Sequence, residues 1–103
     1  MNPKESETQK QVMDYLRWKK IFCYKVNNWG FRKQDGGFIP QQQKGIPDII
    51  CHYKGQVIYL EIKSEKGKQS EHQLAFNEQC VRDGIQYFIV RNLDQLIKIL
   101  DAV

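Results

Sequence analysis

Hydrophobic and polar positions along this chain follow two different periods, one typical of helices and one of strands. Positions 6–20 place apolar residues at helical spacing and predict a first helix from about Ser6 to Lys20, with Ser6 as its capping residue. The next segment, 22–26, alternates and is rich in residues that favour strands. The chain therefore opens with a helix followed by a strand.

Two further apolar runs predict a β-hairpin. Residues 48–53 and 56–63 are rich in β-branched and aromatic side chains, and Lys54-Gly55 between them supplies the turn. Their nearly continuous hydrophobicity is typical of strands in the middle of a sheet. The segment 27–44 before them is rich in Gly, Gln and Asn and shows no clean period, so we expect a long loop of the kind that often carries function.

The remainder of the chain predicts a helix, a strand and a helix. Ser70 and Gln73 fit a capping box that opens a second helix, and Gly84 stands where a helix terminator belongs. Residues 87–91 predict the fourth strand. Asn92 caps a last helix with one apolar stripe, formed by Leu93, Leu96, Ile97 and Leu100. The order α-β-β-β-α-β-α predicts an α/β fold with a mixed four-stranded sheet flanked by helices.

Length and composition indicate one small domain without a membrane segment. The 103 residues suffice for a single core, so we treat 1–103 as one domain. A mean hydropathy of −0.63 and the polar N-terminal residues predict a soluble intracellular protein. The cysteines are widely spaced in apolar segments, which indicates buried free thiols rather than disulfides or a zinc site; they are Cys23, Cys51 and Cys80.

The hairpin also carries candidate chemistry. Glu61 and Lys63 are two residues apart on a strand and share one face of the sheet, while Ile62 points to the apolar side. Asp48 begins the preceding strand, so its carboxylate is expected at the same end of the ribbon, as in a divalent-metal site. Taken singly, Asp48 is also explained as a turn residue after proline, and Glu61 as an edge carboxylate paired with Lys63.

These motifs resemble the PD-(D/E)XK nuclease superfamily, with Pro47-Asp48 as the PD and Glu61-Ile62-Lys63 as the ExK. The chain as a whole resembles the virus-type replication-repair nuclease (VRR-NUC) family. The stretches that carry this resemblance are Ser6-Glu7 with Gln11 and Leu16, Gly45–Ile50, Gly67–Gln73 and Ile89–Arg91. They cover nearly the whole chain in the family's order. The resemblance implies a restriction-endonuclease-like core and a single VRR-NUC nuclease domain over 1–103.

The resemblance also implies a ligand set. Asp48 and Glu61 are the expected direct ligands of Mg²⁺ or Mn²⁺, joined by the main-chain carbonyl of Ile62. Phosphodiester hydrolysis builds negative charge on the phosphate oxygens, which is why a hard cation suits the reaction. Lys63 is expected beside the attacking water, where it lowers the pKa of that water, orients it or stabilises developing charge.

Two further predicted site residues have structural alternatives. Glu7 matches the helix glutamate of the family, a metal ligand acting through water, but a glutamate in a first turn also suits the helix dipole; Glu5 is the alternative residue. Gln73 either works in the site, as the resemblance implies, or only closes the capping box. Lys68 and Ser70 could bind a phosphate, yet they lack the glycine pattern of a nucleotide P-loop, so no ATP requirement is predicted.

The charge favours an anionic partner. The net charge is +4 and the pI is near 9.0, and basic residues cluster before and around the motifs. The predicted DNA contacts are Arg32, Lys33, Lys44, Lys66, Lys68 and Ser70. Trp29, Phe31 and Phe38 could stack on unpaired bases, although core or dimer contacts are their commoner role. Arg91 matches a late-strand arginine of the family, and a salt bridge at the strand end explains it equally well.

Together the residues and the resemblance predict a Mg²⁺- or Mn²⁺-dependent endonuclease that cuts DNA. The resemblance implies a homodimer that acts on branched DNA such as Holliday junctions, in the cytoplasm of a bacterial cell or a phage-infected host. A nuclease for flaps, nicks or plain duplex is the alternative among enzymes. A catalytically idle nucleic-acid-binding module is the alternative outside them, although such a module gains nothing from carboxylates that face phosphates.

Overall fold

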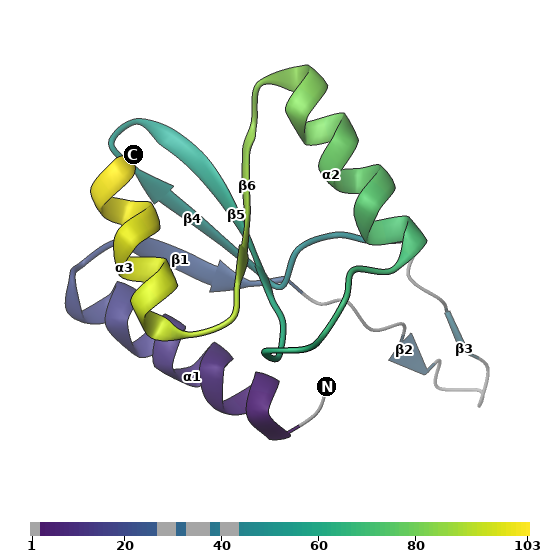
Figure 1. Cartoon of the computed structure of the whole chain (residues 1–103), viewed down its shortest axis with the longest axis horizontal. Coiled ribbons are helices and arrows are strands. Elements are labelled where there is room, and N and C mark those ends of the chain that lie inside the picture. The colour runs from purple at the N-terminus through teal and green to yellow at the C-terminus, as the bar shows by residue number, and fades with distance from the viewer. Residues whose placement is uncertain (1–2, 27–30, 33–37, 40–43) are drawn as a thin grey trace.

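The computed structural model describes residues 3–26, 31–32, 38–39 and 44–103 (Figure 1). The helices are α1 (Pro3–Trp18), α2 (Glu71–Asp83) and α3 (Leu93–Ala102). The strands are β1 (Phe22–Lys25), β2 (Phe31–Arg32), β3 (Phe38–Ile39), β4 (Ile49–Tyr53), β5 (Gln56–Ile62) and β6 (Gln86–Val90). The predicted order α-β-β-β-α-β-α is confirmed, with β2 and β3 as an addition between the first two predicted strands.

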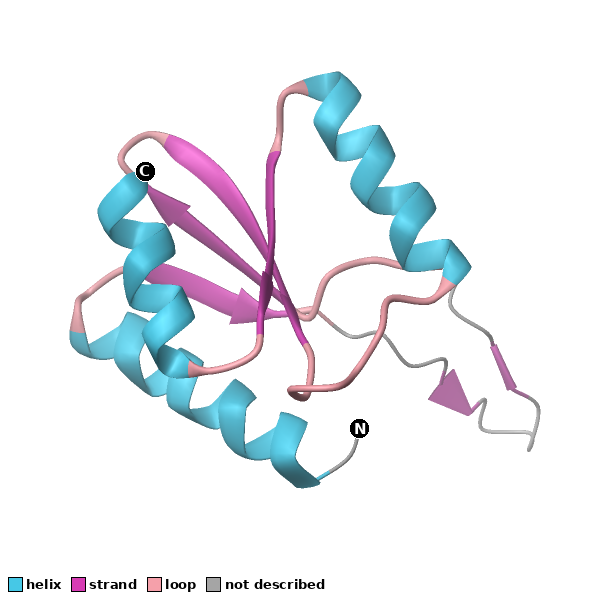
Figure 2. Cartoon of the chain, viewed as in Figure 1, coloured by secondary structure: helices cyan, strands magenta, loops and turns pink. Residues whose placement is uncertain are grey.

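The main sheet has the strand order β1-β4-β5-β6 (Figure 2). β4 pairs antiparallel with both β1 and β5, whereas β5 and β6 are parallel neighbours joined through α2. The turn between β4 and β5 has positive φ at both residues, 51° at Lys54 and 76° at Gly55, which is the geometry of a tight two-residue hairpin. The predicted mixed four-stranded sheet and its hairpin are therefore confirmed.

A second, two-stranded ribbon lies in the segment that we expected to be a loop. β2 pairs antiparallel with β3, and the backbone of Phe31 lies opposite that of Ile39 in the register. Each strand has only two residues, which is too short for hydrophobic alternation to reveal it. Trp29 and Lys33 lie outside the described residues, and the structure describes only the backbone of Arg32 and of the aromatic residues at 31 and 38.

The core lies between the sheet and the pair α1 and α3 (Figure 1). Alternation along β5 puts three residues on this face, none more than 1% exposed: Ile58, Leu60 and Ile62. Val57 points to the opposite face and is 44% exposed. α2 packs on that opposite face, where the Phe76 ring contacts Tyr59 of β5 and Tyr87 of β6. One face of the sheet is thus fully covered, and α2 lies over the β5–β6 side of the other.

The first helix begins and ends earlier than its sequence pattern predicts. It starts at Pro3, whose fixed φ suits the first helical position, so Ser6 lies inside the helix and is not its cap. It ends at Trp18, before the predicted Lys20. Lys20 itself takes a left-handed φ of 60°, and the N–H of Ile21 donates to the carbonyl of Leu16 at 2.9 Å. Helices commonly end in this way with a glycine in the left-handed conformation. Here the residue is a lysine, so the sequence does not signal the end of the helix.

The caps predicted for the later helices are confirmed. Ser70 is the N-cap of α2 and forms a reciprocal capping box with Gln73, while Gly84 ends the helix with a φ of 73°. The side chain of Asn92 accepts the N–H of Gln95 at the start of α3. The apolar stripe of α3 turns inward, with Leu96 and Leu100 buried.

Composition led to two expectations, that the cysteines are buried free thiols and that the chain has no membrane segment. Cys51 and Cys80 are buried and Cys23 is partly exposed, and all three are free thiols. Burial raises the pKa of each of these thiols. Within the described residues, no helix combines the length and the apolar character needed to cross a bilayer.

Candidate active site

Asp48 and Glu61 face each other beside the β4–β5 hairpin. Ile49 pairs with Leu60, so continuing the register by one residue puts Asp48 opposite Glu61. The two carboxyl groups share a hydrogen bond, and Oδ2 of Asp48 also accepts the backbone N–H of Ile62 at 2.8 Å. Asp48 is 8% exposed and Glu61 is 1% exposed; in the described part of the chain they are the buried charged residues. The structure therefore brings together the two predicted metal ligands.

This burial disfavours the negative charge on Glu61. The pKa of Glu61 is raised to about 10, chiefly because its carboxylate loses hydration. The hydrogen bond with Asp48 and the charge of Asp48 raise it further, the charge of Glu5 adds to the rise, and the charge of Lys63 lowers it. Two carboxylates so close together retain a proton between them at neutral pH unless a cation takes its place.

The donor set fits a hard divalent cation. Mg²⁺ and Mn²⁺ bind carboxylate and carbonyl oxygens, and Mg²⁺ commonly takes only one or two protein carboxylates and completes its octahedron with water. The described residues contain no group of three His, Cys, Asp or Glu side chains that could hold a metal ion. The third predicted ligand is a backbone carbonyl, that of Ile62, whose side chain is anchored in the core with 1% exposure. The role of this carbonyl stays a prediction.

Lys63 follows β5 directly, beside the carboxylate pair. Its backbone N–H donates to the carbonyl of Val90 at 3.1 Å, which fixes the main chain at this point. Its ammonium group is close enough to lower the pKa of Glu61, although no ion pair joins the two within the described residues. Glu61 is therefore a buried partner of Asp48 rather than an exposed edge carboxylate paired with Lys63.

In the first turns of α1, the structure brings Glu5 to the site and turns Glu7 to solvent. Oε1 of Glu5 accepts the backbone N–H of Ser64 at 3.2 Å, just beyond β5, and its charge acts on Glu61. Glu7 is exposed. Two residues advance a helix by about 200°, so the two side chains leave α1 on nearly opposite faces. The helix glutamate nearest the carboxylate pair is thus the alternative residue, Glu5.

Gln73 closes the capping box and also contacts the carboxylate pair, while its role in the reaction stays a prediction. Its backbone N–H donates to Oγ of Ser70 at 3.2 Å, and its side-chain Oε1 accepts the Ser70 N–H at 2.9 Å, which completes the capping box. The same side chain donates from Nε2 to Oε2 of Glu61 at 3.1 Å. The capping bond fixes the amide so that its NH₂ group points at the carboxylate. The N-terminus of α2 therefore holds Glu61 in place.

The glycine of the Gly45–Asp48 stretch sets the position of α2 against this site. Gly45 has a φ of +83°, and a Cβ added to it would lie 2.2 Å from the carbonyl oxygen of His72 and 2.9 Å from the N of Gln73. The loop that carries Asp48 therefore touches the first turn of α2 at a point where only glycine fits. This contact joins the element of Asp48 to the element of Gln73.

Arg91 organises the loop after β5, a role that sequence analysis missed. Its Nη1 donates to three backbone carbonyls, at 2.5 Å to Ser64, 3.3 Å to Glu65 and 2.7 Å to Gly67. No ion pair of Arg91 occurs in the described residues, so the salt bridge that was one of its two explanations is not formed. Carbonyl oxygens leave no signal in a sequence, so only the tertiary structure shows that Arg91 shapes the loop between Lys63 and α2.

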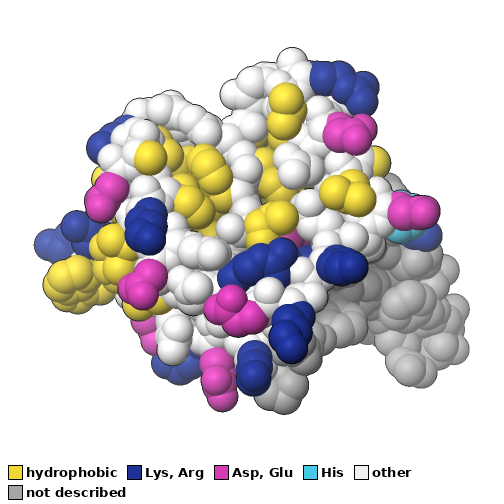
Figure 3. All heavy atoms as spheres, in the orientation of Figure 1, with side chains coloured by type: hydrophobic (Ala, Val, Ile, Leu, Met, Phe, Trp, Pro, Cys, Tyr) yellow, Lys and Arg dark blue, Asp and Glu magenta, His cyan; other side chains and the backbone are white. Residues whose placement is uncertain are grey.

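The predicted DNA contacts lie partly on one exposed face. Lys and Arg side chains gather over the loop between β5 and α2 (Figure 3). Four of the predicted residues are exposed there or at the neighbouring loop before β4: Lys44, Lys66, Lys68 and Ser70. The side chain of Arg32 and the whole of Lys33 lie outside what the structure describes, so these two stay predictions.

Comparison with solved structures identifies the fold. A structure described as a VRR_NUC domain superposes on this chain with a TM-score of 0.74, over 97% of each chain and at 22% sequence identity. No family model and no curated protein sequence matched the chain. The chain therefore has the fold of a VRR-NUC domain, and the resemblance seen in its motifs is confirmed at the level of the fold.

Proposed function

We propose that this chain is a metal-dependent endonuclease that hydrolyses phosphodiester bonds in DNA. The observation that carries the proposal is the pair of buried carboxylates, Asp48 and Glu61, held by a backbone N–H and by the amide of Gln73. Burying two such groups without a cation is unfavourable. The VRR-NUC fold supports the same conclusion. The pair also lies in the two stretches of the sequence that resemble the PD and ExK motifs, Pro47-Asp48 and Glu61-Ile62-Lys63.

In this proposal, Asp48 and Glu61 hold Mg²⁺ or Mn²⁺, with the Ile62 carbonyl as a third ligand. The cation, when bound, supplies charge stabilisation at the phosphate and acidifies a bound water. Gln73 keeps the Glu61 carboxylate in one orientation, because its own side chain is fixed by the capping box. Glu5 contributes negative charge at the rim of the site, in the role that the motif resemblance implies for Glu7.

Lys63 provides positive charge next to the reacting groups. Its ammonium lowers the pKa of Glu61 and so favours the ionised carboxylate that binds metal. The same charge would orient the attacking water or stabilise the charge that develops on the phosphate. Exposed Lys66 and Lys68, with Ser70 at the start of α2, then contact the DNA backbone on either side of the cut.

We further propose that the substrate is branched DNA and that two copies act together. A two-fold homodimer would present two sites to strands that a four-way junction relates by its own symmetry. A flap, nick or duplex nuclease has the same chemistry and is the competing proposal. The idle binding module is disfavoured, because Glu61 would then remain buried and protonated for no purpose.

Cleavage of end-labelled DNA tests the proposal. Linear duplex, a 5′ flap, a 3′ flap and a four-way junction would each be incubated with the purified protein in Mg²⁺, in Mn²⁺ and in EDTA. We expect cutting with either metal, none in EDTA, and the highest rate on the junction. Cutting that favours a flap would replace the junction proposal, and intact DNA under every condition would overturn the nuclease. Light scattering with and without the junction tests the homodimer.

A further inference from the structure

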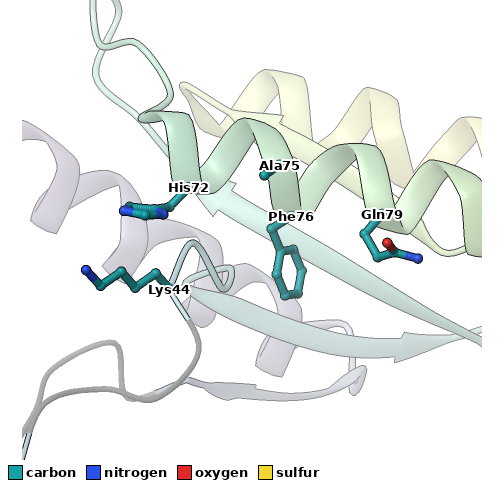
Figure 4. A pocket seen from close by; sticks show the side chains of 5 residues that line it. All are labelled: Lys44, His72, Ala75, Phe76 and Gln79. Atoms are coloured by element: carbon teal, nitrogen blue, oxygen red, sulfur yellow. The ribbon is translucent and has the colours of Figure 1, made fainter.

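A half-open hollow lies beside the active site, along one side of α2. Its volume is about 420 Å³, within the range of about 300–1,000 Å³ found for small-molecule sites. α2 lines it with residues spaced three and four apart, so they form one row: His72, Ala75, Phe76 and Gln79. Lys44, on the loop before β4, lines the end of the row nearest His72 (Figure 4).

The row starts one residue from the carboxylate site. His72 precedes Gln73, which donates to Glu61, and the carbonyl of His72 touches the Gly45 loop that leads to Asp48. A DNA strand whose phosphate lies at the carboxylates must place a neighbouring nucleotide on each side of it. On the α2 side, that neighbour meets the hollow.

The chemistry of the row suits a nucleotide. The Phe76 ring projects from α2 (Figure 4), and its contacts with Tyr59 and Tyr87 hold it in place as a stacking surface. The amide of Gln79 donates from Nε2 to Oδ2 of Asp83 at 3.1 Å, and its second N–H and its Oε1 can meet the edge of a base. At the end near the active site, exposed Lys44 and His72 suit a phosphate. From the active-site end outward, the cationic, apolar and amide groups thus follow one another as contacts for the backbone, the base and the base edge.

We propose, resting on the nuclease function above, that this hollow binds one unpaired nucleotide next to the scissile phosphate. A base inside a duplex has both faces stacked and its edge paired, so it has no face to offer Phe76. The substrate class is therefore DNA that has at least one unpaired nucleotide beside the cut, such as a flap or the opened centre of a junction. α2 forms one wall of the hollow, so a base that enters it must leave the stack of a duplex.

The test uses flap and junction substrates in which abasic sites replace one base at a time around the cut. Loss of stacking on a single aromatic ring is worth about 1–3 kcal/mol, so we expect one abasic position on one side of the cut to lower kcat/KM by roughly 5- to 150-fold. Ala75→Trp fills the hollow and removes none of the Phe76 contacts. The Ala75→Trp variant should cleave the substrate without abasic sites more slowly by a similar factor. An abasic site at the sensitive position should then lower its cleavage no further. Val81→Trp is the matched control, since Val81 is 72% exposed on the same helix and does not line this hollow.

A second readout needs no cleavage. In Asp48→Asn protein, 2-aminopurine at the unpaired position should lose fluorescence when it stacks on Phe76. The quenching should vanish with Ala75→Trp and persist with Val81→Trp. A flat abasic scan, or no difference between the two tryptophan variants, overturns the hollow as a nucleotide site even where the wild type cuts DNA. Quenching with Asp48→Asn, combined with no cleavage by the wild type, would support the hollow and overturn the nuclease.

Discussion

The contact between Gly45 and α2 offers a quantitative test of how the fold builds the site. A Gly45→Ala substitution puts a Cβ 2.2 Å from the His72 carbonyl oxygen, and ordinary contact begins at 3.4 Å, so the two must separate by about 1.2 Å (3.4 − 2.2). The positive φ adds about 1–2 kcal/mol of strain, and overpacking adds about 1–3 kcal/mol. We expect a loss of about 2–5 kcal/mol in the free energy of unfolding.

Gly84→Ala is the matched control. Its φ is +73°, close to the +83° of Gly45, but a Cβ there meets nothing within 4 Å. The control should lose only the backbone term of about 1–2 kcal/mol. In a domain of this size each kcal/mol shifts Tm by about 4–8 °C, so thermal melting resolves the two variants.

Cleavage adds a second measure of the same perturbation. A 1 Å displacement of α2 breaks the 3.1 Å bond from Gln73 to Glu61, and a misplacement of that size can lower the rate by about 100-fold. At a temperature where both variants are folded, we expect Gly45→Ala to lose cleavage and Gly84→Ala to retain it. Equal melting shifts together with full activity of Gly45→Ala would refute this account of the contact.

Three other predictions concern the carboxylate pair. Without metal, the folded state keeps the Glu61 proton up to its pKa of about 10, whereas the unfolded chain releases it near 4.5. The stability of the apoprotein therefore falls as pH rises between these values. Because metal takes the place of this proton, the rise in Tm on adding Mg²⁺ should be larger at pH 8.5 than at pH 6. Gln73→Glu keeps the capping box but replaces the donor to Glu61 with a carboxylate, so cleavage should fall by about 10- to 100-fold with little change in Tm. Glu5→Gln should lower cleavage more than Glu7→Gln, because only Glu5 reaches the loop after β5.

Each of these has a contrary outcome. A Mg²⁺-induced shift in Tm that is equal at both pH values would mean that metal does not displace the Glu61 proton. Wild-type cleavage by Gln73→Glu would mean that Gln73 only closes the capping box. A greater loss of cleavage with Glu7→Gln would mean that Glu7 is the helix glutamate of the site, as the motif resemblance implies.

The parts of the fold that local patterns determine were predictable. The alternation of side chains along a strand put Glu61 and Lys63 on one face of the sheet. The register of a two-residue hairpin brought Asp48 opposite Glu61. The capping box at Ser70 follows from two residue types at a fixed spacing, and so it was also visible. The capping role of Gln73 is confirmed, and its amide also reaches Glu61 because one side chain has two polar ends.

What escaped prediction depends on helix phase and on the backbone. The start of α1 at Pro3 instead of Ser6 decides which glutamate faces the site, and both residues are plausible helix starts in sequence. Lys20 ends the helix in a conformation that usually signals itself through glycine. Arg91 binds carbonyl oxygens, which every residue carries. These features emerge only when distant segments pack together.

The most direct test of the central claim compares the wild type with Glu61→Gln. The amide keeps the shape of the buried side chain. At pH 8 the wild-type carboxylate must take up a proton on folding, because burial raises its pKa to about 10, and the amide does not, so the variant should melt at or above the Tm of the wild-type apoprotein. Its cleavage of labelled branched DNA in Mg²⁺ should nevertheless fall by on the order of 100-fold or more, since a metal ligand is lost. A well-folded Glu61→Gln protein that cuts DNA at the wild-type rate would contradict the proposed metal-dependent nuclease site.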